Sequence, residues 1–109
     1  MELSKKKCEP CEGKGNPFNA EQAKQYLAQI SDWVLSEDGK WIFRDYVMKN
    51  FVAGVEFIRK VADIAEAENH HPDIHLTGYK KVRIELSTHA IGGLSENDFI
   101  VAAKINELM

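Results

Sequence analysis

The sequence has little cysteine, little proline and no long apolar run. Two of its 109 residues are cysteine and three are proline, too few cysteines for a disulfide framework. No apolar stretch approaches the ~20 residues that a membrane-spanning helix needs. A basic excess is also missing, because the net charge is −3, so nucleic-acid binding is not expected. Without a secretory signal or paired cysteines, a cytoplasmic location is expected.

The composition is typical of one soluble domain. Hydrophobic residues make up 44% and charged residues 28% of the chain. Residues 1–17 are expected to form a flexible N-terminal tail, because proline and glycine interrupt them and no apolar periodicity is present. Residues 18–109 are then expected to form a single domain. Removal of residues 1–15 is expected to leave the folding and any activity of this domain unchanged.

The remaining chain predicts three helices and four strands in the order of an α+β domain. Apolar residues at three- to four-residue spacing predict helices over 19–30, 50–69 and from Ser95 toward the end. Asn19 with Gln22, and Ser95 with Asp98, match capping boxes. Aromatic, branched and alternating residues predict strands over 33–36, 41–47, 73–76 and 81–87.

Two hairpins separated by a long helix predict the architecture. Asp38-Gly39 and Thr77-Gly78 supply the hairpin turns. We therefore expect a four-stranded antiparallel sheet with three helices packed on one face. Its open edges invite pairing with a second subunit, so a homodimer is expected.

All four histidines lie between residues 70 and 89. Histidine has an unperturbed pKa of ~6.5, which suits proton transfer near neutral pH. His70 and His71 end the long helix, and His89 follows the last strand. Because the two strands between them form a hairpin, we expect these three histidines at one corner of the sheet.

Plainer interpretations of these residues remain open. Adjacent histidines at a helix C-terminus interact favourably with the helix dipole. Asp98 can serve solely as a helix cap, and Glu66 can be a solvated surface residue. The sequence pattern alone does not decide between these interpretations and a catalytic one.

A metal site is the second alternative. His70, His71, Asp73 and His75 fall within six positions, but Pro72 disrupts the helical spacing that such ligands use, so no metal is expected. Cys8 and Cys11 resemble half of a zinc knuckle without a second pair. They are expected to be an exposed feature of the tail.

Several motifs together resemble the pterin-4a-carbinolamine dehydratase family, in particular its bacterial and plant-like members. The resemblance covers residues 19–108, and the N-terminal Cys-x-x-Cys also occurs in bacterial members. The residues that carry it are Glu66-x-x-x-His70-His71-Pro72, Tyr79, Leu86-Ser87-Thr88-His89, Gly93-Leu94-Ser95 and Asp98-Phe99.

The resemblance implies a hydro-lyase of tetrahydrobiopterin biosynthesis. Such an enzyme dehydrates a 4a-hydroxytetrahydropterin to the quinonoid dihydropterin without metal or organic cofactor. The family fold matches the one expected above. Members form homodimers through edge strands, and some form homotetramers through helices.

The resemblance also implies roles for individual residues. His70 and His89 would be the acid–base pair, and His71 would hold the substrate. The supporting residues would be Glu66 and Asp98, which orient the histidines, and Pro72, which fixes the entry to the site. The backbone of Asp73, Ile74 and His75 would bind the pterin.

The chain departs from many members of this family between Pro72 and Tyr79. One additional residue lies there, which is expected to lengthen the hairpin turn, and the His75 side chain has no counterpart. Two other functions stay open: a protein-binding or dimerisation module, and a pterin-binding protein of molybdopterin metabolism. The presence of His70, His71 and His89 together favours the enzyme.

Overall fold

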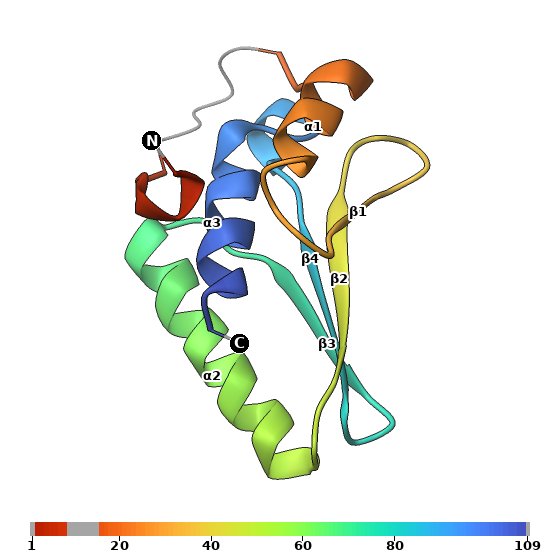
Figure 1. The fold of residues 1–109 in the computed structure, drawn as a ribbon, viewed down its shortest axis with the longest axis vertical. Helices are drawn as coiled ribbons and strands as arrows, with labels where there is room; N and C mark the ends of the chain where they lie inside the picture. Colours follow the sequence, from red (N-terminus) through yellow and green to blue (C-terminus); the bar gives the residue numbers. More distant parts are fainter. Residues whose placement is uncertain (1, 9–15, 109) are drawn as a thin grey trace.

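The structure, a computed structural model, describes residues 2–8 and 16–108. Three α-helices lie on one side of a four-stranded sheet, with two short 3₁₀ helices beside them (Figure 1). The predicted α+β class is confirmed. The elements in chain order are η1 (Leu3–Lys5), α1 (Ala20–Leu27), β1 (Val34–Leu35), β2 (Ile42–Val47), α2 (Phe51–Glu68), β3 (Asp73–Thr77), β4 (Lys81–Leu86), η2 (His89–Ile91) and α3 (Glu96–Asn106).

The sheet is antiparallel throughout, in the order β1-β2-β4-β3. Asp73 pairs with Glu85, and Thr77 pairs with Lys81. The start of β3 and the end of β4 therefore lie at the same end of the sheet, as the hairpin predicted. In this order β3 is an edge strand.

The core lies between the sheet and the helices. Alternating residues of β2 and β4 face inward, and Ile42, Ile84 and Leu86 are fully buried. Helix α3 is buried along most of its length. Helix α2 approaches the sheet at Gly54, where an added Cβ would lie 3.4 Å from Leu76 Cδ1.

Local sequence signals explain how the helices begin. The Asn19–Gln22 and Ser95–Asp98 capping boxes are both present. The Asn50 side chain accepts a hydrogen bond from the Ala53 N–H at the start of α2. Helix α1 ends at Leu27, three residues earlier than predicted, where the chain continues in a turn.

The first strand is shorter than predicted, since β1 has two residues. The turn that follows matches its sequence. The Asp38 carboxylate accepts hydrogen bonds from Ser36 Oγ at 2.6 Å and from the Lys40 N–H at 2.9 Å. Gly39 has a φ of +72°, which glycine adopts without steric cost.

The structure differs from the expected tail over residues 2–8. Leu3 is 5% exposed and belongs to the hydrophobic core. Cys8 is half-buried rather than exposed, because its backbone and side chain contact α2 and α3. The other member of the cysteine pair, Cys11, lies outside the described residues.

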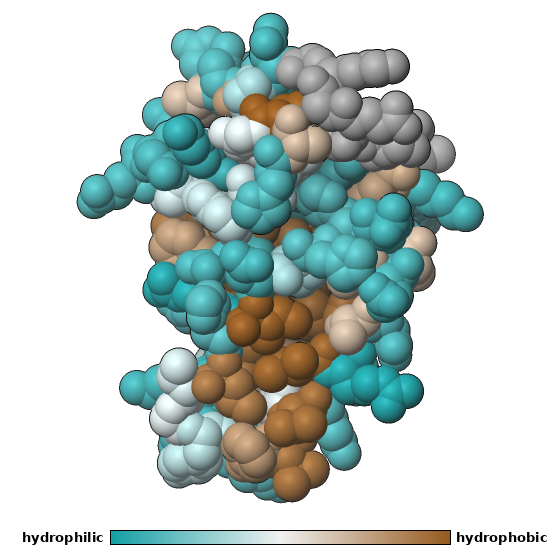
Figure 2. Space-filling model, turned by 180° about the vertical axis from the view of Figure 1, so that it is seen from behind, coloured by the Kyte–Doolittle hydropathy of each residue, from teal (hydrophilic) through white to brown (hydrophobic). Residues whose placement is uncertain are grey.

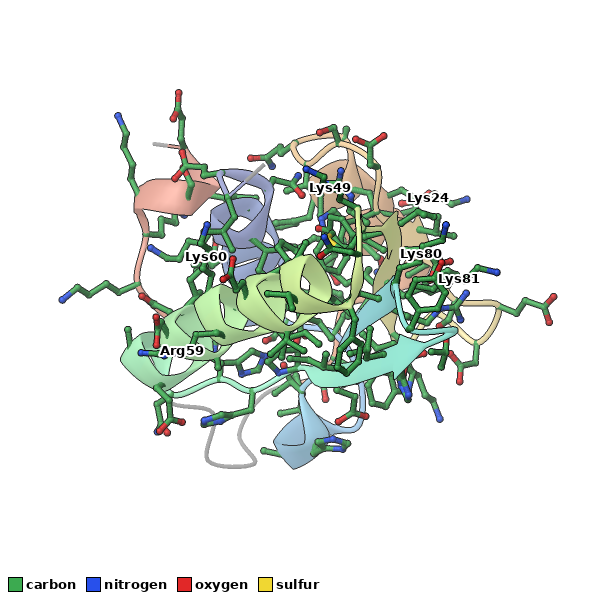
Figure 3. The ribbon with its side chains drawn as sticks, turned by 90° about the horizontal axis from the view of Figure 1, so that it is seen from below. Lys24, Lys49, Arg59, Lys60, Lys80 and Lys81 are labelled. Carbon is green, nitrogen blue, oxygen red and sulfur yellow. The ribbon has the colours of Figure 1, made fainter. Side chains whose placement is uncertain are left out.

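The basic side chains come from several elements. In Figure 3 the labelled ones belong to α1, the segment before α2, α2 itself, the β3–β4 turn and the start of β4. They are Lys24, Lys49, Arg59, Lys60, Lys80 and Lys81. These basic side chains are therefore not gathered along a single helix or strand. In the part of the chain described here, no helix is both long and apolar enough to cross a membrane.

Candidate active site

The His70 side chain is fixed at the end of α2. Asn69 adopts the left-handed conformation, with a φ of +52°, and ends the helix. The His70 N–H then bonds to the Ala65 carbonyl at 3.1 Å. Its imidazole Nε2 lies 2.7 Å from Asp98 Oδ1, and the side chains of His70 and Asp98 are 12% and 0% exposed.

Asp98 is held by two further donors. Thr88 Oγ1 donates to Asp98 Oδ2 at 2.8 Å, and the Ser95 N–H donates to the same oxygen at 3.0 Å. Because the carboxylate accepts on both oxygens, His70 is expected to donate its Nε2–H. Its Nδ1 is then the proton-accepting nitrogen of the neutral ring.

The loop after β4 carries His89. The backbones of Thr88 and Gly93 form an antiparallel bridge, with Thr88 N to Gly93 O at 2.8 Å. His89 begins η2 within this closed loop and is exposed. Its ring packs edge-on against Trp41, with centroids 5.6 Å apart and planes at 76°.

His71 lies on the surface beside Glu66. Its Nε2 forms a short hydrogen bond to Glu66 Oε2, and both side chains are more than half exposed. Glu66 is one of the two carboxylates that the family resemblance expects to orient the histidines. The pair of His71 and Glu66 is separate from the buried pair of His70 and Asp98.

The structure therefore connects the two ends of the predicted site through Asp98. His70 bonds to one carboxylate oxygen, and Thr88, the residue before His89, bonds to the other. Neither Thr88 nor Trp41 has a role predicted from the sequence. For Thr88, the sequence offered one signal, because this residue lies directly before His89 and follows β4.

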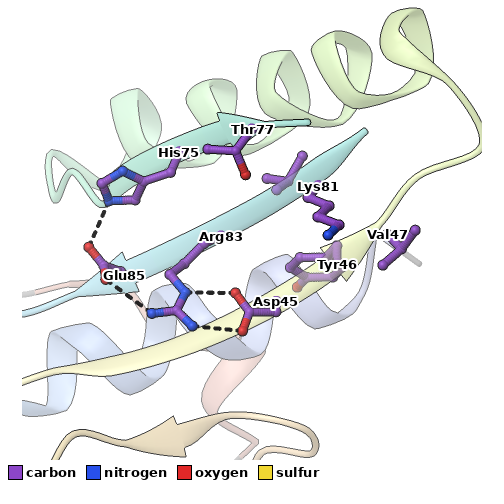
Figure 4. Close-up of a pocket in the computed structure, with 9 residues that line it drawn as sticks. Asp45, Tyr46, Val47, His75, Thr77, Lys81, Arg83 and Glu85 are labelled. Atoms are coloured by element: carbon purple, nitrogen blue, oxygen red, sulfur yellow. Dashed lines mark hydrogen bonds and ion pairs between the residues drawn. The ribbon is translucent and has the colours of Figure 1, made fainter. Parts of the chain in front are cut away.

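His75 points elsewhere. Its Nε2 lies 2.8 Å from Glu85 Oε1 on the sheet face opposite the helices. His75 is one of the residues that line a groove of about 600 Å³, in which Arg83 makes two hydrogen bonds to Asp45 (Figure 4). This groove is not part of the site around His70 and Asp98.

The three residues expected to bind a pterin through their backbone begin β3. Asp73 and His75 are exposed, and Ile74 between them is half-buried and packs against the core. Pro72 directly precedes this strand. Within residues 2–8 and 16–108, no three His, Cys, Asp or Glu side chains are arranged to hold a metal ion.

An α+β domain with a histidine supported by a buried carboxylate suits acid–base chemistry. Comparisons with known proteins identify which such domain this is. The family profile described as Pterin 4 alpha carbinolamine dehydratase matches residues 16–108. The chain belongs to this family, and the predicted enzyme class, a hydro-lyase, is the class that its name states.

The relatives include plant and bacterial proteins, as the resemblance predicted. Pterin-4-alpha-carbinolamine dehydratase 2, mitochondrial, from Arabidopsis thaliana is 52% identical over 110 residues, which cover 98% of this chain and 59% of the plant protein. The chain thus spans less than two thirds of that relative. A Halorhodospira halophila relative named for the same activity is 44% identical over 108 residues and is covered to 98%.

A solved structure shows the same fold. The Brucella melitensis protein described as a transcriptional coactivator/pterin dehydratase matches with a TM-score of 0.79 at 27% identity. The match covers 85% of this chain and 98% of that one. The predicted arrangement of three helices on a four-stranded sheet is confirmed by this likeness.

Proposed function

We propose that the protein dehydrates a 4a-hydroxytetrahydropterin to the quinonoid dihydropterin. In this elimination a base removes the N5 proton, and the N5 electron pair forms the C4a=N5 double bond. The C4a–O bond breaks, and an acid protonates the departing hydroxyl as water. One proton is taken and one is given, so no redox partner is required.

His70 is proposed as the base. Asp98 accepts its Nε2–H, which leaves Nδ1 available to receive a proton. The buried carboxylate then faces the imidazolium that forms. Fixed charge that is already in place stabilises a developing charge without reorganisation.

His89 is proposed as the acid. It lies on the loop in which Thr88 donates a hydrogen bond to Asp98. The same carboxylate bonds to His70, so Asp98 links the segments that carry the two histidines. Trp41 supports one side of the His89 ring and leaves the remainder exposed to a substrate. A catalytic acid of this kind contributes about 10²–10⁴-fold.

His71, oriented by Glu66, is proposed to hold the pterin at the mouth of the site. Pro72 and the first residues of β3, Asp73 to His75, would offer backbone donors and acceptors to the amide edge of the ring. No organic cofactor or metal ion is needed for these steps.

The hydrogen-bonded connection from His70 through Asp98 to Thr88 carries this proposal, and histidine variants test it. In a stopped-flow assay of quinonoid dihydropterin formation, His70→Ala and His89→Ala are each expected to lower turnover by at least about tenfold. Lys24→Ala provides a control because Lys24 is an exposed side chain of α1 with no assigned part in the site. The assignment is wrong if the His70 and His89 variants retain parental turnover.

The acid and base roles have their own test. A general base produces the acidic limb of the pH–rate profile, and a general acid produces the alkaline limb. Residual activity of His70→Ala is expected to lose the acidic limb, and that of His89→Ala the alkaline limb. An exchange of these limbs would reverse the two roles.

We also propose that the protein forms a homodimer through its edge strand, with a tetramer formed through helices. Strands β1 and β3 form the two edges of the described sheet. Figure 2 shows an apolar patch on one face of the molecule. At the start of α2, Phe51, Val52 and Val55 are 53%, 62% and 46% exposed, which is unusual for side chains of this size.

Light scattering tests the helical contact. Val52→Asp places a charge among these apolar side chains and is expected to reduce the molar mass by at least half while turnover per chain persists. Glu56→Ala, an exposed change on the same helix, provides the control. An unchanged mass for Val52→Asp would exclude a contact through this surface.

The cellular location and a protein-binding function are also proposed. A cytoplasmic location is proposed, although the Arabidopsis relative is named as mitochondrial. The description of the Brucella protein as a coactivator supports protein binding as a second candidate function. The stopped-flow assay separates the two, because a module that solely binds protein forms no product.

A further inference from the structure

Residues 2–8 precede the part of the chain that matches the family profile, which begins at residue 16. They nevertheless lie against the ends of two helices, and Figure 1 shows η1 beside the end of α2. We call residues 2–8 the N-terminal strap. Its contacts connect two elements that carry the proposed active site.

The strap is anchored on α3. Leu3 is buried in the core, and Lys6 Nζ lies 3.0 Å from Glu96 Oε2. Lys104 Nζ donates to the Ser4 carbonyl at 2.9 Å. These contacts hold the strap at both ends of the helix, since Glu96 begins α3 and Lys104 is in its last turn.

The strap also contacts the end of α2. The Cys8 N–H donates to Glu68 Oε1 at 2.8 Å, and Glu68 Oε2 lies 3.6 Å from Lys104 Nζ. The Glu68 side chain is 10% exposed, so these partners satisfy a carboxylate that is largely removed from water. On its other side, Cys8 Sγ lies 3.7 Å from the Asn97 carbonyl.

These contacts involve residues close in sequence to the two partners of the hydrogen bond between His70 and Asp98. Glu68 is two residues before His70, and Asn97 immediately precedes Asp98. Cys8 therefore joins the backbone segment that carries one partner to the segment that carries the other. Movement of either segment would change the 2.7 Å separation of this pair.

We propose that the N-terminal strap is a positioning element of the active site. By joining the end of α2 to the start of α3, it holds His70 and Asp98 in the geometry needed for proton transfer. A displacement of about 1 Å in a catalytic group can cost about 10²-fold in rate. This proposal rests on the proposed function, and it contradicts the expectation that residues 1–15 are dispensable for catalysis.

The test loosens the strap within the full chain. Leu3→Ala with Lys6→Ala removes its buried side chain and its ion pair. Lys7→Ala is the matched control, because Lys7 is exposed in the same segment. With Cys11→Ser as the background, the rate of Cys8 labelling by a disulfide reagent reports whether the strap is docked.

In the double variant, Cys8 labelling is expected to accelerate and kcat to fall by about tenfold, with KM changed by less than about twofold. The NMR signal of the His70 imidazole Nε2 proton is expected to shift or broaden. The Lys7→Ala control is expected to match the parent in all three measurements. A strap that merely stabilised the fold would lower the melting temperature and leave kcat and the His70 signal unchanged at 25 °C.

Glu68→Gln provides a milder second variant, because it keeps an acceptor for the Cys8 N–H and removes the charge that faces Lys104. It is expected to change labelling and kcat in the same direction by smaller factors. Rapid Cys8 labelling with parental kcat and an unchanged His70 signal, in either variant, would overturn the proposal. The NMR measurement needs no turnover, so it tests the strap even if His70→Ala shows that the catalytic assignment is wrong.

Discussion

Asp98 is a fully buried carboxylate with donors on both of its oxygens. A buried charge is tolerated when its hydrogen bonds are satisfied, and loss of one donor leaves a large desolvation cost. The same three donors also fix the direction in which the carboxylate faces His70. At the scale of single residues, stability and orientation at this site therefore depend on the same contacts.

Thr88→Val tests this dependence, because valine has nearly the shape of threonine and lacks the hydroxyl. The carboxylate loses one donor, so we expect the free energy of unfolding to fall by about 1–3 kcal/mol. Turnover is expected to fall by about tenfold as Asp98 and His70 lose their fixed orientation. Urea unfolding and stopped-flow kinetics measure the two effects.

Thr77→Val is the matched control, since Thr77 is exposed at the far end of β3. It is expected to keep parental turnover. Full activity of Thr88→Val would show that Asp98 keeps its orientation without this hydroxyl.

Residue types predicted part of the site but not its connections. Histidines and carboxylates are chemically distinctive, so His70 and Asp98 could be named from sequence. Thr88 and Trp41 lie just outside β4 and β2, and their importance depends on contacts with Asp98 and His89. His75 has the same chemistry as the other histidines, and the pleat of β3 directs it to the opposite sheet face.

At the scale of elements, the loop between β4 and α3 is fixed by close packing. Gly93 closes this loop through its bridge with Thr88, and a Cβ added at Gly93 would lie 2.7 Å from Pro17 Cβ. That distance is too short for two carbon atoms. Pro17 and Gly93 are therefore able to approach because position 93 has no side chain.

Gly93→Ala is expected to lower the free energy of unfolding by about 1–3 kcal/mol, because the overlap must be relieved by backbone movement. It should also lower turnover, since His89 lies in the same loop. Replacing the opposing residue in the double variant Gly93→Ala with Pro17→Gly removes the clashing Cβ and should restore part of both losses. If the double variant recovered neither stability nor turnover, the losses in Gly93→Ala would not come from the overlap with Pro17.

Elements with strong local signals were predicted well. The capping boxes and the hairpin turn at Gly39 depend on residues within a few positions of one another. The N-terminal strap was missed because its partners, such as Glu68 and Lys104, lie 60 to 100 positions away in sequence. Periodicity cannot report such contacts.

At the scale of the whole molecule, the length of α2 separates the exposed apolar surface from the candidate active site. The exposed apolar side chains lie at the start of this helix, and His70 follows its end. An 18-residue helix is about 27 Å long. Association through the start of α2 can therefore leave the active site open, which is compatible with the proposed oligomer and enzyme in one protein.

Stability of the whole molecule should depend on alkaline pH through Cys8. Burial, and next the nearby Glu68 carboxylate, raise the pKa of the Cys8 thiol from 9.0 to about 12. The folded state thus favours the neutral thiol. The resulting stability is fully present below pH 9 and is lost as the pH rises toward 12.

Between pH 8 and pH 10, the parent is expected to lose about 1 kcal/mol more unfolding free energy than Cys8→Ala. Urea unfolding of both proteins under reducing conditions measures this difference. Burial also raises the pKa of Tyr46, from 10.0 to about 12, but this tyrosine is present in both proteins, so its contribution cancels in the comparison. Identical pH dependence in the two proteins would mean that the strap does not shield Cys8 in solution, which would also remove the basis for using this thiol to follow docking.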